Sequence, residues 1–210
     1  MSVLPNAEAQ TPRFGGFAVG GGTELRFEPG TALPDRTLTI LSGWAGRQRL
    51  LPDGRRQILK LDLAGDICGV FAGSRTADPP VALTHLRAVP TTPAENLGPV
   101  LEFEEWCVFN QLLRLGAMRA TERMSHLLLE IYHRLALAKL AQDHWFDLHL
   151  TQEQLSDVLG LSAVHINRTL QTLRREGLIE CRGVRVRLAK PDDLARTAHF
   201  VLPDGLRRPD

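Results

Sequence analysis

Side chains that could contact DNA are grouped in two short segments near the C-terminal end of this 210-residue sequence. Residues 162–171 read SAVHINRTLQ, and residues 182–187 read RGVRVR. A helix face with neutral polar groups and one arginine suits the major groove, where side chains read base edges. An arginine edge on a β-ribbon suits phosphates, for which charge matters more than sequence. The predicted DNA-binding residues are Ser162, Ala163, Val164, His165, Asn167, Arg168, Gln171, Arg185 and Arg187.

Two helices around a tight turn are predicted to position the first segment. Thr151 is a suitable N-cap with Gln154 as its capping-box partner, and Gly160 supplies the positive φ that often ends a helix. Ser162 can cap a second helix over 163–176. The inward positions of that helix, spaced four and three apart, are Ile166, Leu170 and Leu173.

After residue 179 the apolar period changes from helical to alternating. This places Val184, Val186 and Leu188 on one side of a strand and the arginines on the other. Two helices followed by a basic β-hairpin indicate a winged helix-turn-helix. The alternative is an ordinary small helical domain with a solvated basic hairpin, but the agreement of caps, turn glycine, apolar register and wing favours DNA binding.

Composition narrows the class of protein. The net charge is only +1, yet residues 151–190 hold seven basic side chains against four acidic ones, a local +3. A hydrophobic content of 43% is sufficient for two modest domains. The three scattered cysteines lack metal-ligand spacing and are expected to be reduced thiols, so we expect no metal site. We find neither a membrane-spanning apolar run nor a signal-peptide pattern, and therefore expect a soluble cytoplasmic protein.

The N-terminal half has the pattern of short strands. Residues 1–22 are rich in glycine and small residues, which predicts a flexible tail. Residues 23–100 contain short apolar runs separated by turn signals such as Pro52-Asp53-Gly54, which predicts a β-barrel or β-roll.

A long helix is predicted at 101–119 and a second from about Ala120 to Leu140. An aromatic and aliphatic stripe on the first helix indicates an interface or core, and its members are Leu101, Phe103, Trp106, Phe109, Leu112, Leu113 and Leu115. The predicted interface residues among them are Phe103, Trp106, Phe109 and Leu113. Gly116 interrupts the stripe, and a hinge is expected near Gly116–Arg119. Cys107 on this helix is expected to be either a packed interface residue or a redox-sensitive thiol.

In this order of elements, the chain resembles the catabolite-activator and fumarate–nitrate regulator (Crp/Fnr) family over roughly residues 24–190. The matching motifs, besides most of 150–180, are Ser42-Gly43, Pro52-Asp53-Gly54-Arg55, Gly65-Asp66-Ile67-Cys68-Gly69 and Thr121-Glu122-Arg123-Met124. The resemblance implies an α+β fold: a cyclic-nucleotide-binding-like β-roll (jelly roll) at 23–100, a dimerisation helix and hinge at 101–119, and a winged helix-turn-helix domain at 120–210.

The resemblance also implies the function. We expect a homodimeric bacterial transcription regulator that binds a palindromic double-stranded DNA operator through helix 163–176 and contacts RNA polymerase. Cyclic-nucleotide-binding relatives hold the phosphate with an arginine followed by serine or threonine, which here corresponds to Arg75 and Thr76, but Val70 stands where their ribose-binding glutamate belongs. An iron–sulfur cluster would need four closely spaced thiolates, and haem ligation by His85 or Cys68 lacks support, so the cofactor is unknown.

Three alternatives remain at this point. The chain could be a regulator with a degenerate sensory domain that needs no effector, or a protein-interaction module that uses the winged domain. It could also be an enzyme, but a nucleophile elbow, a phosphate-binding glycine loop and an HExxH motif are all missing from the sequence, so we predict that it is not an enzyme.

Overall fold

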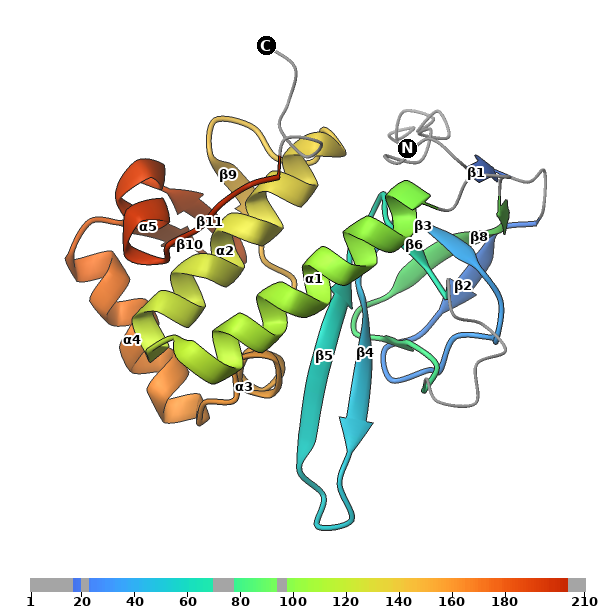
Figure 1. Cartoon of the computed structure of the whole chain (residues 1–210), viewed down its shortest axis with the longest axis horizontal. Helices are drawn as coiled ribbons and strands as arrows, with labels where there is room; N and C mark the ends of the chain where they lie inside the picture. Colours follow the sequence, from blue (N-terminus) through green and yellow to red (C-terminus); the bar gives the residue numbers. More distant parts are fainter. Residues whose placement is uncertain (1–16, 20–22, 70–77, 94–97, 204–210) are drawn as a thin grey trace, which may run out of the picture. The chain divides into compact units, whose positions relative to one another are not determined.

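The computed structural model describes residues 17–19, 23–69, 78–93 and 98–203, whose helices and strands are drawn in Figure 1. Short strands precede two long helices, and a helix-turn-helix with a β-hairpin follows. This order confirms the predicted α+β class. Among the described residues, no helix combines the length and apolarity that a membrane span requires.

The described residues form two compact units. The first contains residues up to Ala45 together with Asp62–Glu102, and the second contains Gly46–Leu61 together with residues from Phe103 onward. Residues 46–61 therefore group with the C-terminal helices, although the sequence pattern assigns them to the β-roll. Side-chain hydrogen bonds to the helix-turn-helix, described below, account for this grouping.

Short antiparallel strands build the first unit. The strand β8 pairs with β1, β2 and β3, and β3 pairs in turn with β6. The strands are β1 (Phe17–Val19), β2 (Leu25–Phe27), β3 (Leu38–Ser42), β6 (Ile67–Cys68), β7 (Val81–Ala82) and β8 (Leu86–Pro93). Side chains from these strands and from the segments beside them form one apolar core, which includes Leu33, Leu38, Ile40, Ala45, Ala64, Cys68, Ala82, Leu86 and Ala88.

Two features of this unit bear on the sequence predictions. Within the expected tail over 1–22, the structure describes only Phe17–Val19, and these residues form β1 against Thr91–Pro93 of β8 instead of a free chain. At the Ser42-Gly43 motif, Gly43 has a φ of +82°, and a Cβ there would lie 2.2 Å from the carbonyl oxygen of His85. Glycine is therefore required at this turn for two reasons, backbone conformation and space.

A long β-hairpin begins the second unit. It consists of β4 (Ala45–Leu50, whose first residue belongs to the first unit) and β5 (Arg56–Asp62). Leu51 donates its N–H to the Arg55 carbonyl at 2.8 Å, and Gly54 donates to the Leu51 carbonyl at 2.9 Å. These bonds close the predicted Pro52-Asp53-Gly54 turn, which is confirmed.

Helices make up most of the second unit, and a small sheet with the order β10-β11-β9 completes it. Helix α1 spans Gly98–Ala117, with its first turn in the first unit, and α2 spans Ala120–Leu137. The remaining elements are β9 (Trp145–Asp147), α3 (Gln152–Leu159), α4 (Ala163–Arg175), β10 (Ile179–Arg182), β11 (Arg185–Leu188) and α5 (Pro191–Thr197). The sequence analysis predicted no strand at β9, because three residues carry too little periodicity to indicate one.

The break between α1 and α2 lies within residues 116–119, the region in which the sequence analysis expects a hinge. Gly116 lies within α1, and the helix is interrupted only at Met118–Arg119. Arg119 is the N-cap of α2, and its backbone N–H donates to the Glu122 carboxylate at 2.8 Å. A lone glycine is tolerated inside a helix, so its presence did not indicate where the helix ends.

Candidate nucleic-acid interface

The α3–α4 pair is held by the caps that the sequence predicted. Thr151 accepts a hydrogen bond from the Gln154 N–H at 3.1 Å, and the Gln154 side chain accepts one from the Thr151 N–H at 2.9 Å. Gly160 ends α3 with a φ of +62°. Ser162 then caps α4 by accepting from the His165 N–H at 3.3 Å. The predicted helix-turn-helix is therefore confirmed at its cap residues.

The outward face of α4 contains every residue that the sequence placed there. Ser162, Ala163, Val164, His165, Asn167, Arg168 and Gln171 are all exposed. Together with Gln152, five of them border a shallow hollow: Ala163, Val164, Asn167, Arg168 and Gln171. Gln152 was missed by the sequence reasoning, because the first residue of α3 belongs to no apolar or basic pattern.

The inward face of α4 differs from the prediction at one position. Ile166 and Leu173 are buried as expected, but Leu170 is only half-buried and Thr169 is buried instead. Thr169 donates its hydroxyl to the His165 carbonyl at 2.8 Å, which satisfies its polar group inside the helix. A hydroxyl satisfied in this way can be buried, which the apolar pattern could not show.

The chemistry available on the outward face is that of base recognition. An arginine can donate two hydrogen bonds to guanine, and asparagine or glutamine can bind adenine through both amide atoms. Alanine and valine can contact only the thymine methyl group. Arg168, Asn167 and Gln171 therefore offer hydrogen-bonding groups on this face, while Ala163 and Val164 offer only apolar surface.

The wing is basic, but its charges are partly compensated. Arg187 forms an ion pair with Glu180 at 3.0 Å, and Arg185 lies 3.6 Å from Asp147. The guanidinium groups of Arg182 and Arg185 lie over the Trp145 ring, at 5.0 and 5.3 Å from its centre. Since the Arg185 side chain is 61% exposed, it remains accessible to a phosphate while Trp145 orients it.

The sequence reasoning missed Trp145 and misplaced Val184. Trp145 lies on the unpredicted strand β9, which pairs with β11. Val184 was expected on the inward side of the hairpin, but it is 57% exposed because it lies in the turn before β11 rather than in the alternating strand. Val186 and Leu188 are buried as predicted.

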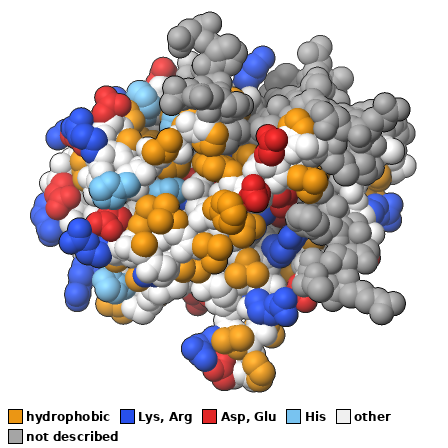
Figure 2. Space-filling model, in the orientation of Figure 1, with side chains coloured by type: hydrophobic (Ala, Val, Ile, Leu, Met, Phe, Trp, Pro, Cys, Tyr) orange, Lys and Arg blue, Asp and Glu red, His pale blue; other side chains and the backbone are white. Residues whose placement is uncertain are grey.

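An exposed apolar face runs along α1, where Figure 2 shows hydrophobic side chains gathered. Its members are Leu101, Val108, Phe109, Leu112 and Leu113. Phe109 and Leu113 belong to the predicted dimerisation stripe, and Phe109 is 59% exposed. Leu101 and Leu112 of the predicted stripe also lie on this face, together with Val108, which the sequence analysis did not include.

Two members of the predicted stripe point elsewhere. Phe103 is only 6% exposed, and the Arg134 guanidinium lies 5.2 Å from its ring centre. Trp106 is half-buried and stacks on Phe103 at 5.8 Å. Cys107 is buried on the same inward side. Phe103 is therefore a core residue, because the helical turn separates it from the exposed face.

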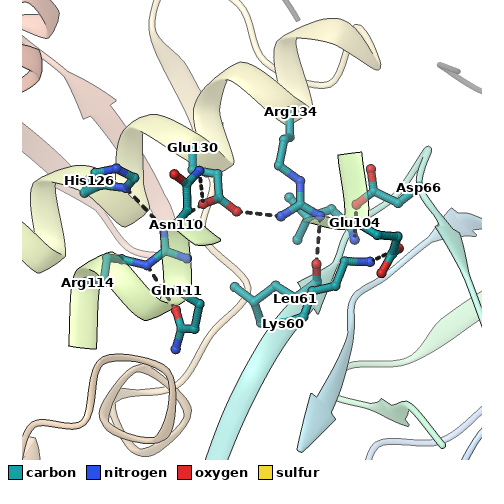
Figure 3. Close-up of polar contacts among 11 residues, drawn as sticks. Lys60, Leu61, Asp66, Glu104, Asn110, Gln111, Arg114, His126, Glu130 and Arg134 are labelled. Atoms are coloured by element: carbon teal, nitrogen blue, oxygen red, sulfur yellow. Dashed lines mark hydrogen bonds and ion pairs between the residues drawn. The ribbon is translucent and has the colours of Figure 1, made fainter. Parts of the chain in front are cut away.

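Beneath this face, a buried ion network joins α1 to α2 (Figure 3). The Glu130 carboxylate accepts from Arg114 at 2.6 Å and from Arg134 at 2.8 Å, and Arg114 also lies 3.2 Å from His126 Nδ1. Burial alone would raise the pKa of Glu130, but the two arginines outweigh it and lower that pKa to about 2. Burial, aided by the Arg114 charge, lowers the pKa of His126 to about 4.

The predicted effector residues Arg75 and Thr76 lie outside the described residues. Cys68 and Cys107 are buried, Cys181 is half-buried, and burial raises the pKa of the Cys181 thiol. Within the described ranges, no group of three or more His, Cys, Asp or Glu side chains could hold a metal ion.

Comparisons with known proteins identify the domain that contains these residues. Residues 122–197 match the family model of a Crp-like helix-turn-helix domain. The transcriptional activator protein FnrL of Cereibacter sphaeroides is 30% identical over 172 residues, which cover 72% of this chain and 67% of FnrL. The transcriptional activatory protein AadR of Rhodopseudomonas palustris is 29% identical over 174 residues, which cover 74% of this chain and 72% of AadR. The solved structure of FixK2 from Bradyrhizobium japonicum has a TM-score of 0.70 at 22% identity, covering 86% of this chain and 99% of that one, and supports the fold.

Proposed function

This chain belongs to the catabolite-activator and fumarate–nitrate regulator (Crp/Fnr) family, and from that premise we propose how it recognises DNA. Members of the family are DNA-binding transcription regulators and not enzymes. The chain is accordingly a DNA-binding regulator. The observation that carries the proposal is the fully exposed polar face of α4, held by capped helices.

In our proposal, α4 enters the major groove with its N-terminal residues at the base edges. Arg168 binds a guanine through two hydrogen bonds and is the main determinant of sequence preference. Asn167 and Gln171 add amide contacts, and Ala163 and Val164 contact thymine methyl groups. Arg185 and Arg187 of the wing bind phosphates, with Arg185 the stronger contact because it is more exposed and its ion pair with Asp147 is longer than that of Arg187 with Glu180.

We also propose that two copies bind together. The exposed apolar face of α1 is the surface that a second copy would cover, since such a face is costly to leave in water. Two-fold symmetry then requires a palindromic operator with half-sites about 34 Å apart, which is one helical turn of DNA. The dimer would act on RNA polymerase at promoters in the cytoplasm, and Arg75 and Thr76 are the proposed effector residues.

The proposal is tested by selecting bound sequences from a random duplex pool, followed by affinity measurements on variants. Arg168→Ala should weaken binding by about 1–3 kcal/mol and relax the preference at one base pair of each half-site. Arg185→Ala should weaken binding to all sequences about equally and make affinity less dependent on salt. Arg26→Ala, a change at an exposed arginine of the first unit, is the control and should leave affinity unchanged.

Two results would contradict the assignment. A uniform loss with Arg168→Ala would make this residue a phosphate contact instead of a base contact. Failure of the wild-type protein to select any duplex sequence would refute the proposed recognition by α4.

A further inference from the structure

The C-terminal end of α3 is held by side chains from three other elements. The last carbonyl groups of a helix have no partner within it. The carbonyls of Val158 and Leu159 accept from the Gln111 amide at 2.6 Å and from Arg123 Nη1 at 2.9 Å. The Gln57 amide donates to the carbonyls of both Asp157 and Val158. These donors come from α1, α2 and β5, so the end of α3 is hydrogen-bonded to all three elements.

Gln111 is the centre of this arrangement. Its side chain is buried, with the residue only 4% exposed. Besides the bond to Val158, its amide nitrogen donates to the Ile58 carbonyl of β5 at 3.1 Å, and its amide oxygen accepts from Arg114 Nε at 3.0 Å. Both amide protons and the oxygen are therefore used. Since Arg114 binds Glu130, this one amide connects the helix-turn-helix to the ion network between α1 and α2.

Arg123 forms hydrogen bonds at the nearby break between α1 and α2. It donates through Nε to the Met118 carbonyl at 2.8 Å and through Nη2 to the Leu115 carbonyl at 3.2 Å, besides its bond to Leu159. A positive charge is favourable at the negative end of a helix dipole. One guanidinium group therefore donates hydrogen bonds to the end of α1, to the α1–α2 break and to the end of α3.

The hairpin adds an outer contact. Arg56 of β5 donates through Nε to the Asp157 carboxylate at 2.7 Å, next to the Gln57 bonds. The amide nitrogen of Gln111 donates to two carbonyls, and that of Gln57 lies within hydrogen-bond distance of three, a bridge that an apolar side chain of the same size cannot make. The α3–α4 pair is thus held by hydrogen bonds in addition to apolar packing.

We propose that Gln57, Gln111 and Arg123 are positioning residues for DNA recognition. They touch neither base nor phosphate, but they fix the direction in which α3 and α4 leave α1. If α1 pairs with its copy, as the proposed function requires, this direction sets the distance between the two recognition helices. The three residues therefore determine which spacing of half-sites the dimer accepts.

The test compares duplexes with one half-site and duplexes with two half-sites at graded spacings, using the full chain and the half-site selected by the wild type. Gln111→Glu keeps the acceptor for Arg114 but, when ionised, cannot donate to Val158 or Ile58. It should lower affinity for the preferred two-site duplex at least about tenfold, as expected when two hydrogen bonds no longer select the competent orientation. Affinity for the single half-site should stay within about twofold, and the preference for one spacing should flatten.

Two controls distinguish a positioning role from a general loss of stability. Gln142→Glu makes the same chemical change at an exposed position and should alter neither quantity. Thr39→Val removes a buried hydrogen bond to Thr91 in the first unit and should lower stability without changing the spacing preference. Gln57→Leu, at a half-buried position, should flatten the preference in the same direction as Gln111→Glu, and it replaces that variant if Gln111→Glu does not fold.

An unchanged spacing preference in both Gln111→Glu and Gln57→Leu would overturn the inference. Equal losses of affinity for one-site and two-site duplexes would overturn it as well. Both results leave α4 as the reading helix, because the wild type still binds its half-site. If the wild type binds no duplex at all, the proposed function fails, and the inference that rests on it fails too.

Discussion

Glu130 offers a direct test of how the second unit is held together. Its carboxylate lies between Arg114 and Arg134, and all three side chains are almost completely buried. Glu130→Gln keeps the shape but removes the negative charge, which leaves two buried guanidinium groups without their partner. Removing one member of a buried ion pair typically costs about 3–5 kcal/mol. The lowered pKa gives an independent magnitude, because the difference between 4.5 and about 2 corresponds to about 3 kcal/mol.

The sign of the pH dependence follows from the direction of the pKa. Because the carboxylate has a lower pKa in the folded protein than in the unfolded one, its contribution is complete above pH 4.5 and is lost as the pH falls toward 2. A glutamine imitates the protonated carboxyl group. The difference in unfolding free energy between the wild type and Glu130→Gln should therefore be greatest near neutral pH and should shrink below pH 4.5.

The assay is urea unfolding followed by circular dichroism at one protein concentration, at neutral pH and at steps down to the lowest pH where the wild type is folded. Asp53→Asn is the matched control, since it makes the same change in an exposed ion pair with Arg55 and should cost no more than about 1 kcal/mol. A loss for Glu130→Gln no larger than that of the control would refute the reasoning. A difference from the wild type that does not shrink in acid would refute it as well.

Four further predictions concern single residues. His126 is neutral in the folded protein, with a pKa of about 4, while the unfolded chain takes up the proton at a higher pH, so wild-type stability should fall between pH 6.5 and pH 4. Urea titration at pH 5 should show that the wild type has lost about 2 kcal/mol of its stability, a loss that His126→Gln lacks. Gly160→Ala should cost about 1–2 kcal/mol and lower the melting temperature, because the φ is positive and the new Cβ would lie 3.1 Å from the Leu115 side chain. Thr151→Ala should cost about 1 kcal/mol in the same measurement, by loss of the α3 cap, and an unchanged midpoint would contradict the capping role. Phe109→Glu should shift sedimentation toward the monomer without lowering helix content, and an unchanged sedimentation coefficient would argue against α1 as the dimer surface.

Local patterns predicted the DNA-binding end of the chain well. The caps at Thr151 and Ser162, the end of α3 at Gly160 and the exposure of Arg168 are all decided within one or two helical turns. Such features depend on backbone geometry and on a helical period, both of which are present in the order of residues. The same holds for the hairpin turn at Pro52-Asp53-Gly54.

The errors arose where a local signal had two meanings. Phe103 and Phe109 both fit an apolar stripe on α1, but one is covered by Arg134 and the other is exposed. The deciding factor is which neighbouring element covers the residue. Gly116 itself lies inside α1, and the break follows at Met118–Arg119, within the expected hinge region 116–119.

The sequence by itself determined the family, the winged helix-turn-helix and the side chains that face outward on α4, because caps, turns and periodicity act between near neighbours. Only the tertiary structure decided that Gln57, Gln111 and Arg123 meet the end of α3, and that Arg114 of α1 pairs with Glu130 of α2. The partners of these groups are as many as 101 residues apart in the chain. Contacts of this kind leave no periodic trace in the sequence, since buried polar groups are paired by the approach of whole elements and not by their spacing.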